Sequence, residues 1–167
     1  YGLVGSEMCI RDRALVNAVR DTELEIPVLL GAFCMMRRRE ICGLSMDDIR
    51  GNTIHVHHSL VLGTDKKWHL KVPKTETSDR YIEAPGFVTD RIRELGYITN
   101  LNPHSITIMF QRVLERNNII HFRFHDLRHS YVKPTTKNYF LPSNSCNSSI
   151  LSRKWHSTGE RIFSCFF

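Results

Sequence analysis

The sequence predicts an α+β domain that is mainly helical and carries a small antiparallel sheet. A chain of 167 residues is long enough for one hydrophobic core but hardly for two. Apolar residues recur with a helical period on both sides of a central stretch, residues 53–82, in which they recur with a period of two. With 41% hydrophobic and 24% charged residues, the composition is that of a globular chain rather than a disordered or fibrous one.

The first part of the chain predicts two helices. Leu15, Ala18 and Val19 lie on one face of the first helix. Pro27 is placed to open the second, an apolar helix expected to run directly into residues 37–40. Its apolar run, residues 26–36, is shorter than the roughly 20 residues that a membrane-spanning helix needs. We therefore expect a buried helix and no membrane partner.

Three short strands are predicted in the central stretch. Ile54 and Val56 alternate with polar residues, as half-buried strands require. After a turn signal at residues 63–66, a second alternating run contains Trp68, Leu70 and Val72, and residues 80–82 can form a third strand. A polar loop, residues 73–79, joins the last two strands.

Helices are predicted again after Pro85. Val88, Ile92 and Leu95 share one face, and Gly96 is placed to end that helix. Asn102-Pro103 is a strong start signal for the next helix, whose apolar stripe consists of Ile106, Met109, Phe110, Val113 and Leu114. Residues 125–131 are interpreted as the opening of another helix, with Asp126 in its first turn.

These elements delimit one domain over residues 14–132. Residues 1–13 resemble translated adapter DNA and are expected to be non-native. Over residues 133–167 the apolar period is lost, so we expect an irregular tail that is frame-shifted or disordered, with a linker as the alternative.

Charge and cysteine content narrow the class of protein. A formal charge of +6 favours a polyanionic partner such as nucleic acid, because bound phosphates release counterions, although many basic proteins bind nothing anionic. The cysteines are odd in number and contain no CxxC pair, so neither a disulfide framework nor a zinc site is indicated. No secretory signal pattern opens the chain, and a cytoplasmic location is expected.

Four residues are candidates for binding an anion. His125 and Arg128 stand three apart, so they share a helix face and can address one phosphate; a solvated helix start is the alternative. Arg37 follows an apolar helix and can be held in place, whereas Arg38 and Arg39 are interpreted as a basic surface turn. Lys74 lies in a loop between strands, where it either reaches a substrate or is merely solvated.

In their order along the chain, these pieces resemble the catalytic domain of the tyrosine recombinase (phage integrase) family over residues 14–132. Residues 37–44, with Arg37 three positions before Glu40, are similar to the family's first box, although Met35 stands where the family has Gly and Arg39 where it has a small residue. Residues 73–82 resemble the β-hairpin motif that carries the lysine, which matches Lys74. Residues 125–131 resemble the second box, in which His125 and Arg128 match the functional positions.

The family's third box is not found in register. The family has Gly-His or Gly-Trp about two dozen residues after the second arginine, and a nucleophilic tyrosine about ten residues later. Trp155-His156 lies near that distance but no tyrosine follows it, and Tyr139 is too close to Arg128. Whether Trp155 or His156 takes the place of the third-box residue stays open. We therefore assign no nucleophile and expect a catalytic domain that is incomplete at its C-terminal end.

The resemblance implies DNA recombination or integration through a 3′-phosphotyrosine intermediate, in a phage or another mobile element. It implies that Arg37 and Arg128 stabilise the phosphate, that Lys74 protonates the leaving 5′-oxygen and that His125 assists proton transfer, with neither metal nor other cofactor. The implied partners are double-stranded DNA and other recombinase subunits in a tetramer. Without the nucleophile no strand cleavage is expected; the alternative is a non-catalytic DNA-binding remnant.

Two hypotheses that require a metal ion compete with the recombinase hypothesis. A magnesium nuclease would need the carboxylates Glu40, Asp47 and Asp48, which are better interpreted as turn and capping residues. A zinc site would need His55, His57 and His58, but on a strand the first two share a face that the third opposes. We therefore expect a solvated strand face and no metal site.

Overall fold

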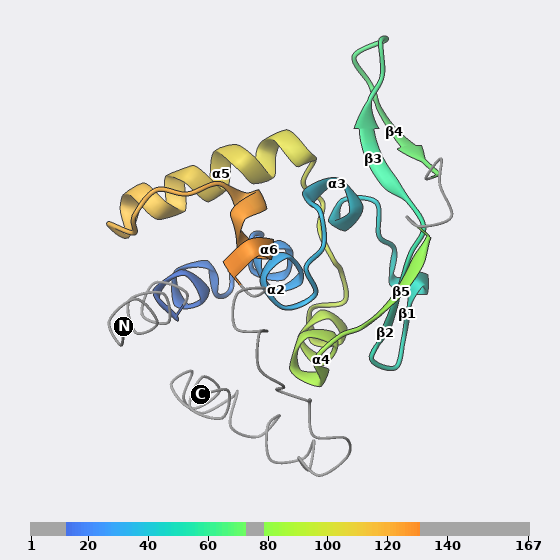
Figure 1. The fold of residues 1–167 in the computed structure, drawn as a ribbon, viewed down its shortest axis with the longest axis horizontal. Helices are drawn as coiled ribbons and strands as arrows, with labels where there is room; N and C mark the ends of the chain where they lie inside the picture. The colour runs from blue at the N-terminus through green and yellow to red at the C-terminus, as the bar shows by residue number, and fades with distance from the viewer. Residues whose placement is uncertain (1–12, 73–78, 131–167) are drawn as a thin grey trace.

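The computed structural model describes residues 13–72 and 79–130 of the chain, and these residues form a mainly helical α+β fold with antiparallel strands (Figure 1). Residues 13–19 are helical. The other helices are α2 (Glu25–Phe33), α3 (Arg38–Ile41), α4 (Gly86–Leu95), α5 (Pro103–Arg116) and α6 (Leu127–Ser130), with 3-10 turns η1 (Met46–Asp48) and η3 (Phe124–Asp126). The strands are β1 (Ile49–Arg50), β2 (Thr53–Val56), β3 (Ser59–Leu62), β4 (Trp68–Lys71) and β5 (Arg80–Glu83). The fold class expected from the sequence is confirmed.

Helix α2 is the centre of the packing. It contacts α3, α4, α6 and η3, and its residues 25–31 are all buried. This explains why its sequence is apolar on every side: a helix that is covered all round has no face for polar residues. The prediction of a buried helix is confirmed, and no helix among the described residues is long and apolar enough to cross a membrane.

The expectation that this apolar helix runs into the arginines is wrong. Helix α2 ends at Phe33, and Met35 adopts a left-handed backbone with φ 52°. Met36 then folds back and donates its N–H to the carbonyl of Leu30 over 3.3 Å. Arg37 is extended, with φ −77° and ψ 144°, and is the N-cap of α3. A helix often ends at a residue with left-handed backbone, and that residue is usually glycine. Because the residue here is methionine, the sequence of this segment does not predict the break.

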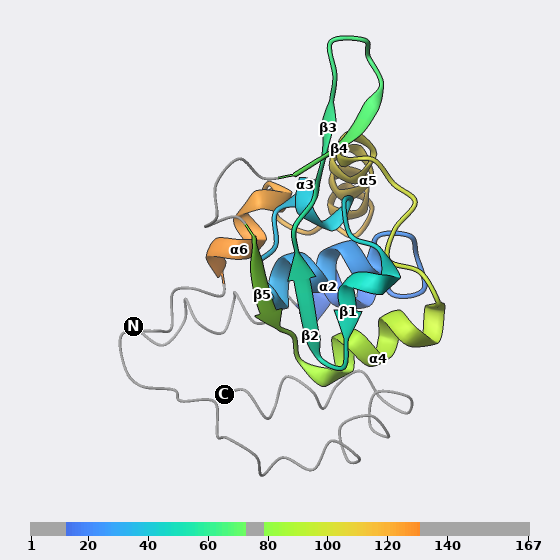
Figure 2. The same ribbon diagram turned by 90° about the vertical axis from the view of Figure 1, so that its right-hand side faces the viewer.

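The strands form two sheets where the sequence predicted one. Strands β1, β2 and β5 make a three-stranded antiparallel sheet, and β3 and β4 make a separate antiparallel hairpin that projects from the body (Figure 2). The sequence missed β1 because it is only two residues long, and β3 because its Ser-Leu-Val-Leu does not alternate. The register of β2 and β5 pairs Val56 with Arg80.

The two later helices follow their sequence signals. Gly96 ends α4 in the left-handed conformation, with φ 74°. Asn102 caps α5, and its Oδ1 accepts from the backbone N–H groups of His104 at 3.0 Å and Ser105 at 2.8 Å. Of the predicted stripe of α5, Ile106, Phe110 and Leu114 are buried and the other two are partly buried against the core.

The second-box segment packs on α2 at a glycine. A Cβ atom on Gly31 would lie 3.1 Å from Cζ of Phe124 and 3.4 Å from Cδ1 of Leu127, so the absence of a side chain lets η3 and α6 approach α2 closely. Both apolar residues are buried, and Phe124 also packs edge-on against Phe110, with ring centroids 5.4 Å apart. This contact places Arg128, one residue further on, beside the α2–α3 connection.

Candidate active site

Arg37 and Glu40 form the first part of the site. The Nη1 of Arg37 donates to Oε1 of Glu40 over 2.8 Å, and the backbone N–H of Arg37 donates to Oε2, also over 2.8 Å. Glu40 is buried, whereas the side chain of Arg37 is 55% exposed. The carboxylate of Glu40 thus holds one nitrogen of the Arg37 guanidinium, and the rest of that guanidinium faces solvent.

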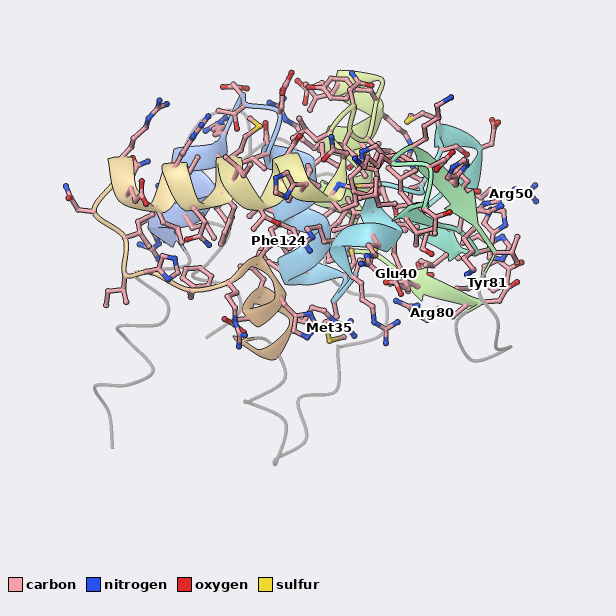
Figure 3. All side chains as sticks on the ribbon, turned by 90° about the horizontal axis from the view of Figure 1, so that it is seen from above. Met35, Glu40, Arg50, Arg80, Tyr81 and Phe124 are labelled. Carbon is pink, nitrogen blue, oxygen red and sulfur yellow. The ribbon has the colours of Figure 1, made fainter. Side chains whose placement is uncertain are left out.

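Arg80 approaches the same carboxylate from the sheet. Its Nη1 and Nη2 donate to Oε1 and Oε2 of Glu40 over 3.1 and 2.9 Å, a bidentate pair (Figure 3). Burial alone would raise the pKa of Glu40, but the hydrogen bonds from Arg80 and Arg37 outweigh it and hold that pKa below its usual value. Glu40 is therefore the ionised hub between α3 and β5.

Arg128 completes a cluster of positive charge. Burial and then the charge of Arg37 lower the pKa of Arg128, and Arg80 acts in the same direction while Glu40 opposes it. The fold therefore holds three guanidiniums around one carboxylate, a net of two positive charges (three minus one). Like charges held together in this way are stabilised by an anion that binds between them.

The structure thus brings together two of the four residues predicted from the sequence, Arg37 and Arg128. His125 lies in η3, exposed, one turn before Arg128. Lys74 is outside the described residues, as are residues 1–12 and 131–167, on which the predictions of a non-native start and an irregular tail fall. The strand that follows the lysine loop, β5, contributes Arg80.

Arg80 and Glu40 are the residues of the site that the sequence did not mark as functional. Both were noticed as parts of motifs, Glu40 in the first box and Arg80 in the lysine motif. A polar residue at the start of a strand is ordinary, so the sequence held no signal that these two, 40 positions apart, would meet.

Arg38 is not the free surface residue that its sequence suggested. Its guanidinium donates to the hydroxyl of Thr107 on α5, and its side chain is half-buried. Burial and the neighbouring charge of Arg39 lower the pKa of Arg38. Arg38 therefore ties α3 to α5, whereas Arg37, on the other side, faces the site.

The carboxylates of the competing nuclease reading serve as caps and ion pairs. Asp48 accepts from the backbone N–H of Ser45 over 2.7 Å and from Nε2 of His57, also over 2.7 Å. Glu40 is bonded to two arginines. Among the described residues, no group of three or more His, Cys, Asp or Glu side chains is arranged to hold a metal ion.

The three histidines of the competing zinc hypothesis contact one another through their rings, His55 and His57 stacked and His58 tilted against His57. His55 lies parallel to His57 and to Tyr81, with centroid distances of 4.3 Å on each side. The expectation that His58 opposes the other two is wrong: β2 ends at Val56, so the alternation does not reach His58, whose ring lies 3.9 Å from that of His57.

The fold of this chain is similar to solved structures of recombinases. The Tn1549 transposon integrase in complex with circular intermediate DNA superposes with a TM-score of 0.61 at 18% identity, over 71% of this chain and 49% of that one. A complex of the same integrase with transposon right end DNA gives 0.59 at 20% identity, over 71% and 48%. The XerA recombinase gives 0.58 at 15% identity, over 73% and 46%.

These similarities define the class of fold. No protein-family model and no curated protein matches the sequence. This chain spans about half the length of the structures that it matches and has the fold of the catalytic domain of tyrosine recombinases.

Proposed function

We propose that this chain is part of a site-specific DNA recombinase of the tyrosine class and that its arginine cluster binds a DNA phosphodiester. The observation that carries the proposal is the group of Arg37, Arg80 and Arg128 around Glu40. A phosphodiester carries one negative charge, so a site with two positive charges in excess attracts it. The fold likeness to integrases solved with DNA supports the same partner.

The proposed chemistry is an attack on phosphorus that is stabilised by arginines. As the attacking oxygen approaches, negative charge grows on the two non-bridging oxygens. We assign Arg37 and Arg128 to donate charge-assisted hydrogen bonds to these oxygens, and such bonds become stronger as the charge grows. We assign Lys74 to protonate the leaving 5′-oxygen and His125 to assist proton transfer, on the strength of their match to the family motifs.

No nucleophile is assigned in this chain. Within the described residues the tyrosines are Tyr81 and Tyr97. Tyr81 is on the opposite face of β5 from Arg80 and stacks on His55, while Tyr97 follows α4. We therefore propose that the chain as written binds DNA without cleaving it, and that cleavage would need a tyrosine from another recombinase subunit. The second candidate function is that the chain binds a DNA phosphate and catalyses no reaction, as a DNA-binding remnant of an integrase would.

A DNA-binding titration with a covalent-capture readout tests the proposal. The full chain is titrated into a fluorescent 30-base-pair duplex at several salt concentrations, and the products are run on a denaturing gel. Arg37→Met and Arg128→Met should each weaken binding and reduce the salt slope by about 1, since each phosphate contact contributes about 0.9. Arg116→Met, at the exposed end of α5, is the matched control for the loss of one charge.

The outcomes separate the candidates. Binding without a protein–DNA adduct supports the DNA-binding form of the proposal, and an adduct formed only after a tyrosine-bearing recombinase is added supports the recombinase form. Cutting that requires Mg²⁺, or binding that Arg37→Met and Arg128→Met weaken no more than the control does, contradicts the proposal.

A further inference from the structure

Arg80 belongs to the arginine cluster, but its positive charge is paired with the carboxylate of Glu40. Both of its terminal nitrogens are bonded to Glu40, at 3.1 and 2.9 Å, and its side chain is only 28% exposed. By contrast, Arg37 gives only one guanidinium nitrogen to Glu40, and its side chain is 55% exposed. The two arginines therefore compete for one carboxylate, and Arg80 holds the larger share.

We propose that Arg80 is a positioning residue: it neutralises Glu40 and so leaves the charge of Arg37 available for the phosphate. This inference rests on the proposed function, since it assigns a role within the same DNA-binding site. Without Arg80, the buried carboxylate would have Arg37 as its nearest cation. A buried carboxylate needs a cation, so Arg37 would be drawn fully into that pair. The site would then retain the charge of Arg128 alone for a phosphate.

The position of Arg80 in the sheet supports this role. Successive residues of a strand point to opposite faces, and Arg80 faces α3 while Tyr81 faces outward. Its place is set by the antiparallel pairing of Arg80 with Val56, a buried residue of β2. The sheet, rather than a flexible loop, therefore delivers the neutralising charge.

A double-mutant cycle with Glu40 tests the inference. The full-length chain and the variants Arg80→Met, Glu40→Gln and Arg80→Met/Glu40→Gln are titrated with the same fluorescent duplex and, separately, with inorganic phosphate followed by arginine side-chain NMR signals. Arg80→Met should weaken DNA binding about tenfold, a size usual for residues that share one ion-pair network. In the Glu40→Gln background the same change should have almost no effect, because no carboxylate remains to capture Arg37.

Arg50 provides the matched control. It is exposed on β1, the far strand of the same sheet, and lies well away from Glu40 (Figure 3). Arg50→Met removes one positive charge, as Arg80→Met does, but its effect on binding should be the same with Glu40 and with Gln at position 40. Arg80→Lys should bind more tightly than Arg80→Met, since an ammonium also neutralises the carboxylate. Thermal unfolding of every variant shows whether each one is folded at the assay temperature.

Each outcome decides the inference. An effect of Arg80→Met that persists undiminished in the Glu40→Gln background would make Arg80 a direct phosphate ligand and overturn the positioning role, while the proposed function stands. Equal binding by Arg80→Met and the original chain also overturns it. If Arg80→Met is unfolded, Arg80→Lys is compared with the original chain in both backgrounds. It should bind nearly as well as the original chain, because its ammonium still neutralises Glu40, and a loss of binding that persists in the Glu40→Gln background would overturn the positioning role. A chain that binds neither DNA nor phosphate overturns both proposals.

Discussion

Two arginine–carboxylate clusters of this molecule differ in which charge is in excess. In the first, Arg91 of α4 is bonded to Glu25 at 2.9 and 3.0 Å, to Asp21 at 2.5 Å and to Glu94 at 3.0 Å, so that one arginine meets three carboxylates. In the candidate active site, three arginines meet one carboxylate. In the first cluster negative charge is in excess and the arginine is fully paired, whereas in the second positive charge is in excess.

The pKa values of the arginines shift in opposite directions. The hydrogen bonds that Arg91 donates to Glu25 raise the pKa of Arg91. Burial opposes this shift, and the bond to Glu94 adds to it. Burial and the charge of Arg37 lower the pKa of Arg128. A cation that its surroundings favour stabilises the fold, and one that they disfavour is stabilised only when a ligand brings the missing charge. This contrast distinguishes the structural cluster around Arg91 from the proposed binding site.

The largest effect on stability should follow from breaking the cluster around Arg91. Glu25 is 1% exposed, so Arg91→Met leaves a buried carboxylate without its main partner. We expect a loss of about 3–5 kcal/mol in the free energy of unfolding, measured by urea denaturation. Arg93→Met is the control, since its pair with Asp90 on the same helix is exposed and should matter by about 1 kcal/mol or less. Equal losses in both variants would show that the Arg91 cluster is not a clamp.

A smaller effect is expected on acidification. The pKa of Glu40 is lower in the folded chain than its unfolded value of about 4.3. Ionised Glu40 therefore stabilises the fold above that pH, and this contribution is lost as the pH falls through the folded pKa. The difference in unfolding free energy between the original chain and Glu40→Gln should shrink between neutral pH and pH ~3. A difference that stays constant over this range would contradict the assigned shift; Glu83→Gln, an exposed change, is the control.

Backbone strain at Met35, next to the candidate active site, provides another test of the difference between the two clusters. Both clusters adjoin a left-handed residue, Asp21 with φ 58° and Met35 with φ 52°, but Asp tolerates this conformation better than Met. Met35→Gly should raise the free energy of unfolding by about 0.5–1 kcal/mol, as measured by urea denaturation. Met46→Gly, an exposed change in η1, should lower it. A destabilised Met35→Gly would mean that the side chain of Met35 contributes packing that outweighs the strain.

The smallest effect on stability is expected at Arg128. Its removal takes away a repelled charge, so Arg128→Met should change the free energy of unfolding by about 0.5 kcal/mol or less while DNA binding is weakened. Parallel denaturation and DNA titrations would check this. A loss as large as that of Arg91→Met would make Arg128 a structural residue and remove the distinction between the two clusters.

The sequence predicted the strongly periodic elements and two residues that meet in the site. Helix α5 was found because an Asn-Pro start precedes a clear apolar stripe, and α4 because Gly96 ends it. Arg37 and Arg128 were found by their motifs. The break between Phe33 and Arg37 was missed because Met35 supplies a left-handed turn that is normally made by glycine. The pairing of β4 with β3 in a separate hairpin was missed because the residues of β3 do not alternate.

The sequence by itself determined the fold class, the end of α4, the start of α5 and the kind of charge that the candidate site carries. These follow from periodicity and from capping residues, which act over a few positions of the chain. Only the tertiary structure decided that Arg80 and Glu40 would pair and that Arg128 would lie close enough to Arg37 for their charges to interact. Those contacts depend on strand register and on the close approach of η3 and α6 at Gly31, which bring together residues that are distant in sequence.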